Sequence, residues 1–214
     1  MSGGDGQKTM TRIPQTLVLT QAEIDRLIDM KTAIRVIEQA FKAYARGDAR
    51  MPSKVYLRLP HGSDFRAMPA ALKHPAVCGV KWVNVHPDNR LTGLPTVMGL
   101  VILNDATTGV PLAVLDGVSV TRLRTGAAGG VAAKALARRD VQTAALVGCG
   151  AQAFAQLQAL VQVRRLRQVK VWGYRPGEAQ RFCARARRHL ALVLIPARTV
   201  EACVRDADLI VTIT

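Results

Sequence analysis

The chain has 214 residues, of which 49% are hydrophobic, and this is typical of a globular protein with one domain or two small ones. No apolar run approaches the roughly 20 residues that span a bilayer, and the polar residues 1–8 lack the apolar stretch of a signal peptide. The net charge of +15 is compatible with a nucleic-acid partner, but aromatic residues make up only 4% and the excess arginine is scattered over the second half. We therefore expect a cytoplasmic protein without a nucleic-acid or membrane partner, whose charge attracts anionic ligands such as phosphorylated cofactors.

The four cysteines are widely spaced along the chain. They are Cys78, Cys149, Cys183 and Cys203. None of their spacings is that of a zinc site or of a redox dithiol. We expect small, unpaired side chains in a reducing compartment and no metal site.

Two helices are expected at the start of the chain. Thr20 with Glu23 three residues later forms a capping box, and apolar residues follow at helical spacing. A second helix over 32–44 stops at Gly47. Alternating apolar residues between Pro, Gly and Asp turns then predict three strands, at 55–59, 77–84 and 95–103.

The second half of the chain has a different organisation. A Gly- and Ala-rich segment, 125–136, predicts a helix that packs closely on a neighbouring element. Strands and helices then alternate, which predicts a parallel sheet. The expected strands are 143–147, 169–172, 190–195 and 209–214, and the expected helices are 152–163, 178–189 and 200–204. No loop or helix follows the last strand, whereas doubly wound folds normally reach about six strands, so we expect this half to be incomplete.

A glycine fingerprint joins the first of these strands to its helix. Gly148 permits a tight turn, Gly150 lets the backbone approach a pyrophosphate, and Ala153 allows close packing of helix on strand. The phosphates would lie at the helix N-terminus. We therefore predict a dinucleotide site with contacts from Gly148, Gly150, Ala151 and Gln152. Cys149, between the two glycines, is interpreted as a small side chain under the cofactor and not as a nucleophile.

The end of the second strand usually carries an acid that binds the ribose of NAD. Here Gly173 is followed by Tyr174 and Arg175, and no acid is at hand. This favours tolerance of a 2′-phosphate and therefore NADP, although NAD stays open. Tyr174 or Arg175 could equally stack on the adenine.

Five segments before the fingerprint resemble the family of ornithine cyclodeaminase, mu-crystallin and archaeal-type alanine dehydrogenase. These segments are 51–57, 64–70, 79–87, 93–98 and 123–128, in the order and spacing of that family. The resemblance implies an α/β protein with an N-terminal α+β substrate-binding and dimerisation domain, 1–124, and an incomplete Rossmann-type NAD(P)-binding domain, 125–214. It also implies a homodimer.

The resemblance assigns roles to individual residues. Arg66 and Arg124 are similar to the guanidinium groups that hold the substrate carboxylate, for which a planar fork is suited. Lys54 stands where some members have a further arginine for the carboxylate, and Lys81 resembles the catalytic lysine beside the reacting carbon. From the residues alone, Lys81 in an apolar strand is either paired, or neutral with a lowered pKa, or an edge-strand lysine that faces solvent. We also expect Thr125 and Thr212 to contact the cofactor.

The chemistry implied is hydride transfer from Cα of a small L-amino acid to a nicotinamide, which leaves an imine. Hydrolysis of the imine gives an alanine dehydrogenase, and cyclisation by a side-chain amine gives an ornithine cyclodeaminase. Reduction of a cyclic imine is the mu-crystallin type of reaction. Further alternatives are a mu-crystallin-like protein that binds NAD(P)H without catalysis and an inactive fragment. Segments 51–57 and 81–87 look most like the alanine dehydrogenase branch, so we expect an NAD(P)-dependent amino-acid dehydrogenase.

Overall fold

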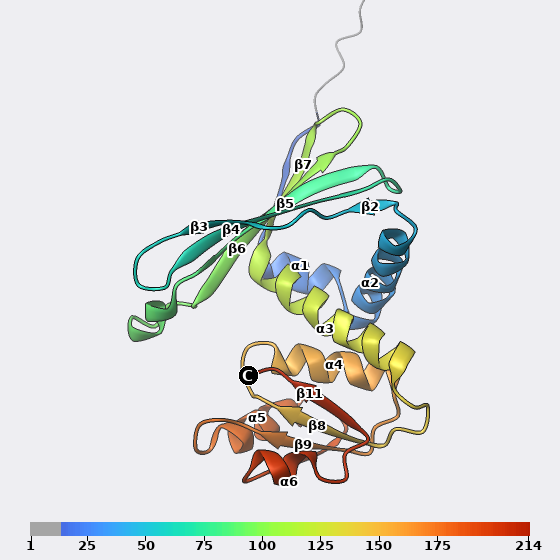
Figure 1. Cartoon of the computed structure of the whole chain (residues 1–214), viewed down its shortest axis with the longest axis vertical. Helices are drawn as coiled ribbons and strands as arrows, with labels where there is room; N and C mark the ends of the chain where they lie inside the picture. The colour runs from blue at the N-terminus through green and yellow to red at the C-terminus, as the bar shows by residue number, and fades with distance from the viewer. Residues whose placement is uncertain (1–13) are drawn as a thin grey trace, which may run out of the picture. The chain divides into compact units, whose positions relative to one another are not determined.

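The computed structural model describes residues 14–214, so the polar residues 1–8 lie outside the described part. The protein is mixed α/β and consists of two compact units (Figure 1). The described part of the first unit comprises residues 14–19 and 50–115, and the second comprises 20–49 and 116–214. The two compact units thus differ from a simple division at residue 124, because residues 20–49 belong with the second half. The functional boundary at residue 124 stays a prediction.

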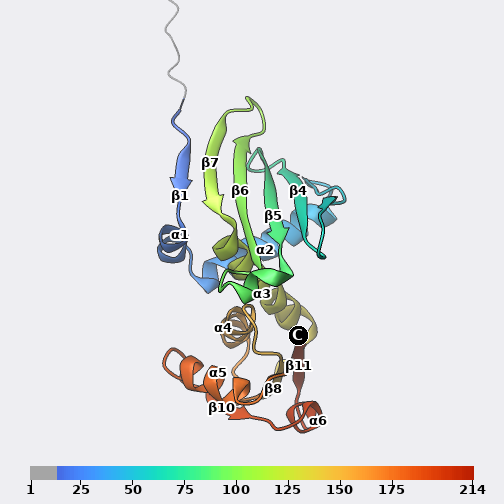
Figure 2. The same cartoon turned by 90° about the vertical axis from the view of Figure 1, so that its left-hand side faces the viewer.

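A seven-stranded sheet forms the first unit. Its strand order is β1-β7-β6-β5-β4-β2, with β3 paired to β4, and the long strands lie side by side in Figure 2. The strands are β1 (Leu17–Leu19), β2 (Ala49–Arg50), β3 (Val55–Arg58), β4 (Asp64–Leu72), β5 (Val77–Val85), β6 (Val97–Asp105) and β7 (Pro111–Asp116), and the short helix η1 (Pro87–Leu91) follows β5. The three strands expected here are confirmed as β3, β5 and β6, whereas β1, β2, β4 and β7 were not expected.

Strands β3 to β6 pair antiparallel in one continuous register. Arg66 on β4 lies opposite Tyr56 on β3 and Val83 on β5, and Lys81 on β5 lies opposite Met68. Directly opposed residues project to the same face of a sheet, and so do residues two apart on one strand. The register therefore decides which side chains of the first unit share a face.

Two helices of the second unit precede residues 50–115 of the first unit in the sequence, and a third follows them. They are α1 (Gln21–Leu27), α2 (Met30–Ala45) and α3 (Gly117–Leu136). The capping box at Thr20 is confirmed, since the Thr20 side chain accepts from the Glu23 N–H and the Glu23 side chain accepts from the Thr20 N–H. The expected start of α3 at residue 125 was wrong by eight residues, because the Asp116 carboxylate caps the helix by accepting from the Ser119 N–H at 2.8 Å.

The small residues of α3 allow it to approach α4 (Ala153–Val163) closely. A Cβ on Gly126 would lie 2.6 Å from the carbonyl oxygen of Ala155, and one on Gly130 would lie 3.0 Å from the Ala159 Cβ. Side chains at these positions would force the helices apart. The expectation that this segment packs tightly on a neighbour is confirmed.

The parallel sheet of the second unit has four strands in the order β10-β9-β8-β11. The strands are β8 (Thr143–Val147), β9 (Gln168–Trp172), β10 (Val193–Pro196) and β11 (Leu209–Thr212), and the helices between them are α4, α5 (Glu178–Ala186) and α6 (Val200–Val204). The alternation expected from the sequence is confirmed, with boundaries shifted by up to three residues.

Helices cover both faces of this parallel sheet. Leu146 on β8 and Val171 on β9 pack in one buried cluster with residues of α4 and α5, whereas Ala145 and Val147 pack against Cys203 of α6. Burial on both faces explains why the strands read as continuous apolar runs. Over residues 14–214, the structure contains no helix with the length and apolar character needed to cross a membrane.

Candidate functional site

The glycine loop connects β8 to α4 in the second unit. Gly148 has a φ of +120°, and a Cβ there would lie 2.6 Å from the Ile213 carbonyl oxygen beyond the end of β11. Gly150 is exposed, and a Cβ on it would have no atom within 4 Å. Ala153 is fully buried where α4 begins. The first glycine is therefore required by the fold, whereas the second borders open space.

The N-terminus of α4 opens from this loop. The first N–H groups of a helix have no intrahelical acceptors, and the N-cap residue Gln152 makes no side-chain capping bond. Its Oε1 is buried and has no hydrogen-bond partner within residues 14–214. Ala151 beside it is exposed. Together with the helix dipole, these N–H groups suit an anion such as a pyrophosphate.

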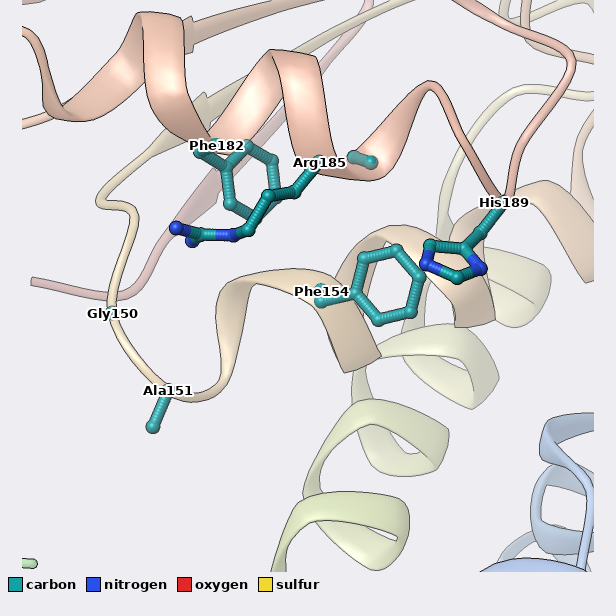
Figure 3. Close-up of a pocket in the computed structure, with 7 residues that line it drawn as sticks. Gly150, Ala151, Phe154, Phe182, Arg185 and His189 are labelled. Carbon is teal, nitrogen blue, oxygen red and sulfur yellow. The ribbon is translucent and has the colours of Figure 1, made fainter.

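A cavity of about 290 Å³ lies against the loop, between α4 and α5. It is lined by Gly150, Ala151, Phe154, Phe182, Arg185, Ala186 and His189. Figure 3 shows the Arg185 guanidinium extending toward the loop and the rings of Phe154 and His189 meeting edge to face, with 5.7 Å between their centroids. The sequence analysis did not single out these residues, because helical periodicity shows only that one face of α5 is buried.

The end of β9 carries the expected residues Tyr174 and Arg175. Tyr174 is 83% exposed and its ring lies edge-on to Trp172, and Arg175 is exposed. An acid that the sequence analysis missed also lies here. The Oε2 atom of Glu178 accepts from the Arg175 N–H at 3.2 Å and lies 2.9 Å from the position of a Cβ on Gly173.

Three other predicted residues belong to the second unit. Thr212 lies at the end of β11, opposite Val147 at the end of β8. Thr212 and the glycine loop are therefore at the same carboxyl end of the parallel strands. Thr125 and Arg124 lie on α3. The Thr125 carbonyl accepts from the Gln156 side chain on α4 at 3.1 Å, which ties this turn of α3 to α4, and Arg124 is exposed.

The remaining predicted residues belong to the first unit and share one face of its sheet. Lys54 and Tyr56 are two apart, Tyr56 lies opposite Arg66, and Arg66 is diagonal to Lys81 across β4 and β5. Diagonal neighbours on one face are about 7–8 Å apart, within reach of long side chains. The structure thus brings Lys54, Arg66 and Lys81 to one surface.

Tyr56 is at the centre of this surface. The Lys54 Nζ lies 5.4 Å from the centroid of its ring, and the Cζ atoms of Arg58 and Arg66 lie at 5.7 and 5.2 Å. Cations at such distances are attracted by the electron-rich face of the ring. Several positive charges are therefore held close together, which favours a bound anion.

Asp64 holds Arg66 in place. Its two oxygens accept from Nε at 2.6 Å and from Nη2 at 2.9 Å, a bidentate pair that fixes the plane of the guanidinium. The hydrogen bond and charge of Arg66 lower the pKa of Asp64 below its usual value, so the pair is intact at neutral pH. The pair uses the edge of the guanidinium that is formed by Nε and Nη2.

The environment of Cys149 agrees with its interpretation as a structural residue. Its thiol is buried and lies 3.4 Å from the Trp172 carbonyl oxygen. Burial, together with the nearby negative charge of Glu178, raises the pKa of Cys149 to about 11. The thiolate is therefore scarce at neutral pH, and a nucleophilic role is disfavoured.

The four cysteines are expected to differ in their reaction with iodoacetamide. Burial also raises the pKa of Cys183 and Cys203, whereas Cys78 is only partly buried. At pH 8, Cys78 should be alkylated before the other three, as measured by peptide mass spectrometry over time. Urea should equalise the four rates. Native labelling of Cys149 as fast as Cys78 would contradict the burial described here.

No group of three or more His, Cys, Asp or Glu side chains that could hold a metal ion occurs within residues 14–214. The candidate binding groups in the described part are the cationic side chains of the first unit and the glycine loop of the second.

Comparison with known proteins shows similarity to oxidoreductases of amino acids and cyclic imines. The chain is 47% identical over 201 residues to an alanine dehydrogenase of Archaeoglobus fulgidus, covering 94% of this chain and 60% of that relative. Among solved structures it is similar to an archaeal alanine dehydrogenase dimer with bound NAD, at 46% identity and a TM-score of 0.85, over 93% of this chain and 60% of that one. It is also similar to the Delta(1)-pyrroline-2-carboxylate reductase of Thermococcus litoralis in complex with NADH and L-proline, at 33% identity and a TM-score of 0.88, over 92% and 61%.

The chain thus spans about 60% of the length of these relatives. The model of the ornithine cyclodeaminase/mu-crystallin family matches residues 14–214, which is the whole described part. The chain belongs to the ornithine cyclodeaminase/mu-crystallin family.

Proposed function

We propose that this chain is the substrate- and cofactor-binding part of an NAD(P)-dependent oxidoreductase that acts on the CH–NH₂ group of a small L-amino acid. The observation that carries the proposal is the register of β3, β4 and β5, which gathers Lys54, Arg66 and Lys81 on one face. A carboxylate-binding surface of this kind suits an amino acid, and the similarity to alanine dehydrogenases favours L-alanine.

The second unit is proposed to be the Rossmann-type dinucleotide-binding part. Its strand order, β10-β9-β8-β11, is the order 3-2-1-4 with which the doubly wound fold begins. The functional division at residue 124, with a substrate-binding domain before it and a dinucleotide-binding domain after it, is part of the proposal. So is a cytoplasmic location, with which four free cysteines are compatible.

The residues of the glycine loop fit a dinucleotide. Gly150 leaves space that a Cβ would occupy, and the N-terminus of α4 offers N–H groups for the pyrophosphate. Thr212 at the adjacent strand end and Thr125 on α3 are proposed as further contacts. When bound, the nicotinamide supplies the hydride acceptor or donor.

The chain's own residues perform binding and proton transfer. Arg66, oriented by Asp64, binds the substrate carboxylate through its remaining N–H groups, with Lys54 as an additional charge and Arg124 as a second guanidinium. Fixing the carboxylate restrains Cα, which is the positioning that hydride transfer requires. Lys81 is the group that accepts or donates a proton at the amine or imine.

The test is an assay of the purified chain with L-alanine and NAD⁺ or NADP⁺, followed at 340 nm. Formation of NAD(P)H with release of pyruvate supports the proposal. Ammonia release from L-ornithine without net NAD(P)H would instead indicate a cyclodeaminase, and cofactor binding without either reaction would indicate a mu-crystallin-like binding protein. A folded chain that binds neither NADH nor NADPH would refute the proposal.

A second copy of this chain is proposed as the partner of the first unit. The sheet face opposite Lys81 carries large apolar side chains that are exposed in the single chain, including Val55 (66%), Leu57 (55%), Leu100 (49%) and Trp82 (40%). Contiguous exposed apolar surface marks an interaction site. The similar archaeal alanine dehydrogenase is a dimer, which favours a homodimer here.

Replacement of Trp82 by glutamate is expected to shift the chain from dimer to monomer. A carboxylate desolvated in an apolar interface is costly, whereas in the monomer it faces water. Light scattering coupled to size-exclusion chromatography measures the mass directly. Leu136→Glu, at an 86% exposed position on α3, is the control that should leave the mass unchanged. A monomeric wild-type chain would contradict this assignment.

A further inference from the structure

The end of β9 lacks the acid that NAD-binding folds usually place there. The residue directly after the strand is Gly173, which has no side chain to offer a ribose. The space beside it is nevertheless filled by a carboxylate. A Cβ on Gly173 would lie 2.9 Å from both the Cβ and the Oε2 of Glu178. A carboxylate from α5 therefore occupies the place of the missing strand-end side chain.

The turn between β9 and α5 holds this carboxylate in position. Glu178 Oε2 accepts from the Arg175 N–H at 3.2 Å, and the Glu178 N–H donates to the Arg175 carbonyl at 3.1 Å. Gly177 has a φ of +75°, which permits the tight reversal before the helix. Within residues 14–214 the side-chain bond uses Oε2, so Oε1 is the acceptor that remains for a ligand.

The carboxylate also lies close to the glycine loop. The negative charge of Glu178 contributes to the raised pKa of Cys149, the residue between the two glycines of that loop. The acid is thus within electrostatic reach of the segment that is proposed to hold the pyrophosphate.

We infer that Glu178 replaces the strand-end acid and binds the hydroxyls of the adenosine ribose, so that NAD is preferred over NADP. The inference rests on the proposed dinucleotide site. A carboxylate accepts from the two ribose hydroxyls but repels a 2′-phosphate, which carries negative charge and offers no comparable donor. This inference reverses the preference for NADP that the sequence around Arg175 suggested. The reason is that the backbone N–H of Arg175 holds the Glu178 carboxylate at this position.

The test is calorimetric titration of the 214-residue chain with NADH and with NADPH. We expect the wild-type chain to bind NADH at least tenfold more tightly than NADPH. Glu178→Gln keeps the size of the side chain and removes its charge. This variant should bind NADH more weakly and NADPH more tightly, so that the ratio of the two affinities falls by tenfold or more. Thermal unfolding of each variant shows whether the turn is intact.

Two further variants separate recognition from structural support. Asp206→Asn removes a charge in the turn before β11, at the opposite edge of the parallel sheet, and should leave the ratio unchanged. The double variant Gly173→Asp with Glu178→Gly removes both Glu178 atoms that a Cβ on Gly173 would meet, moves the acid back to the strand end, and should restore the preference for NADH. If Glu178 only supported the turn, the double variant would not regain the preference for NADH.

Two results would overturn the inference while leaving the proposed function intact. One is a wild-type chain that binds NADPH as tightly as NADH, and the other is an equal loss of both affinities in Glu178→Gln. If the folded chain bound neither dinucleotide, the proposed function itself would fail and the inference with it.

Discussion

Replacing Lys81 by methionine is expected to lower the turnover of an amino-acid substrate by about 10²–10⁴-fold, the usual contribution of a positioned acid or base. Methionine matches the unbranched stem of lysine but has no group that can carry a proton. Cofactor affinity should change little, because the dinucleotide is proposed to bind to the second unit. The measurement is kcat at saturating cofactor and substrate, beside the Kd for NADH.

Arginine at the same position distinguishes a proton carrier from a fixed charge. Arginine stays protonated at all relevant pH values, so Lys81→Arg should be almost as inactive as Lys81→Met if the lysine must release its proton. Lys42→Met, at an exposed position on α2 where Lys42 pairs with Glu38, is the matched control and should retain full turnover. A loss of less than tenfold in Lys81→Met would exclude Lys81 as the proton-transfer group.

Two substitutions in the glycine loop are expected to have opposite effects on stability and on cofactor binding. Gly148→Ala places a Cβ 2.6 Å from the Ile213 carbonyl oxygen, on a backbone whose φ of +120° disfavours side chains. Backbone strain alone costs about 1–3 kcal/mol, and the clash adds to it. A domain of this size loses roughly 2–4 °C in Tm per kcal/mol, so Tm should fall by about 5–10 °C.

Gly150→Val should instead leave the fold intact, because a Cβ there meets no atom within 4 Å. The added side chain occupies the space proposed for the pyrophosphate, and NADH affinity should fall by at least about tenfold, or 1.4 kcal/mol. Differential scanning fluorimetry and NADH titration of both variants measure the two effects. Unchanged NADH affinity in Gly150→Val would show that the cofactor does not approach this glycine.

The second half of the fold could be predicted from the sequence because its signals are local. Buried parallel strands read as apolar runs, and Gly148 and Gly150 follow the first of them at the spacing of a dinucleotide loop. Helix α6 was predicted with its observed bounds, and Thr199 caps it by accepting from the Ala202 N–H. Each of these features depends on neighbours within a few residues, so one sequence suffices.

The first half was harder to predict, since its strands depend on distant partners. β4 contains Arg66 and Pro69, which interrupt the apolar alternation, yet pairing with β3 and β5 makes it a central strand. The N-terminus of α3, which was also missed, has the local cap Asp116 and is held in addition by a contact distant in the sequence. Ser119 near its N-terminus is fully buried and donates to Asp25 of α1 at 2.8 Å, a contact 94 residues away in the sequence.

By itself the sequence determined the family, the glycine loop and the identity of the cationic residues, because these can be recognised from motifs and from the spacing of nearby residues. Only the tertiary structure decided that Lys54, Arg66 and Lys81 share one face, since a strand register depends on hydrogen bonds between segments distant in sequence. It also decided that Glu178 lies at the end of β9. A turn through Gly177 brings that carboxylate back over Gly173, and a turn of this kind changes which residues are neighbours without leaving a periodic signal.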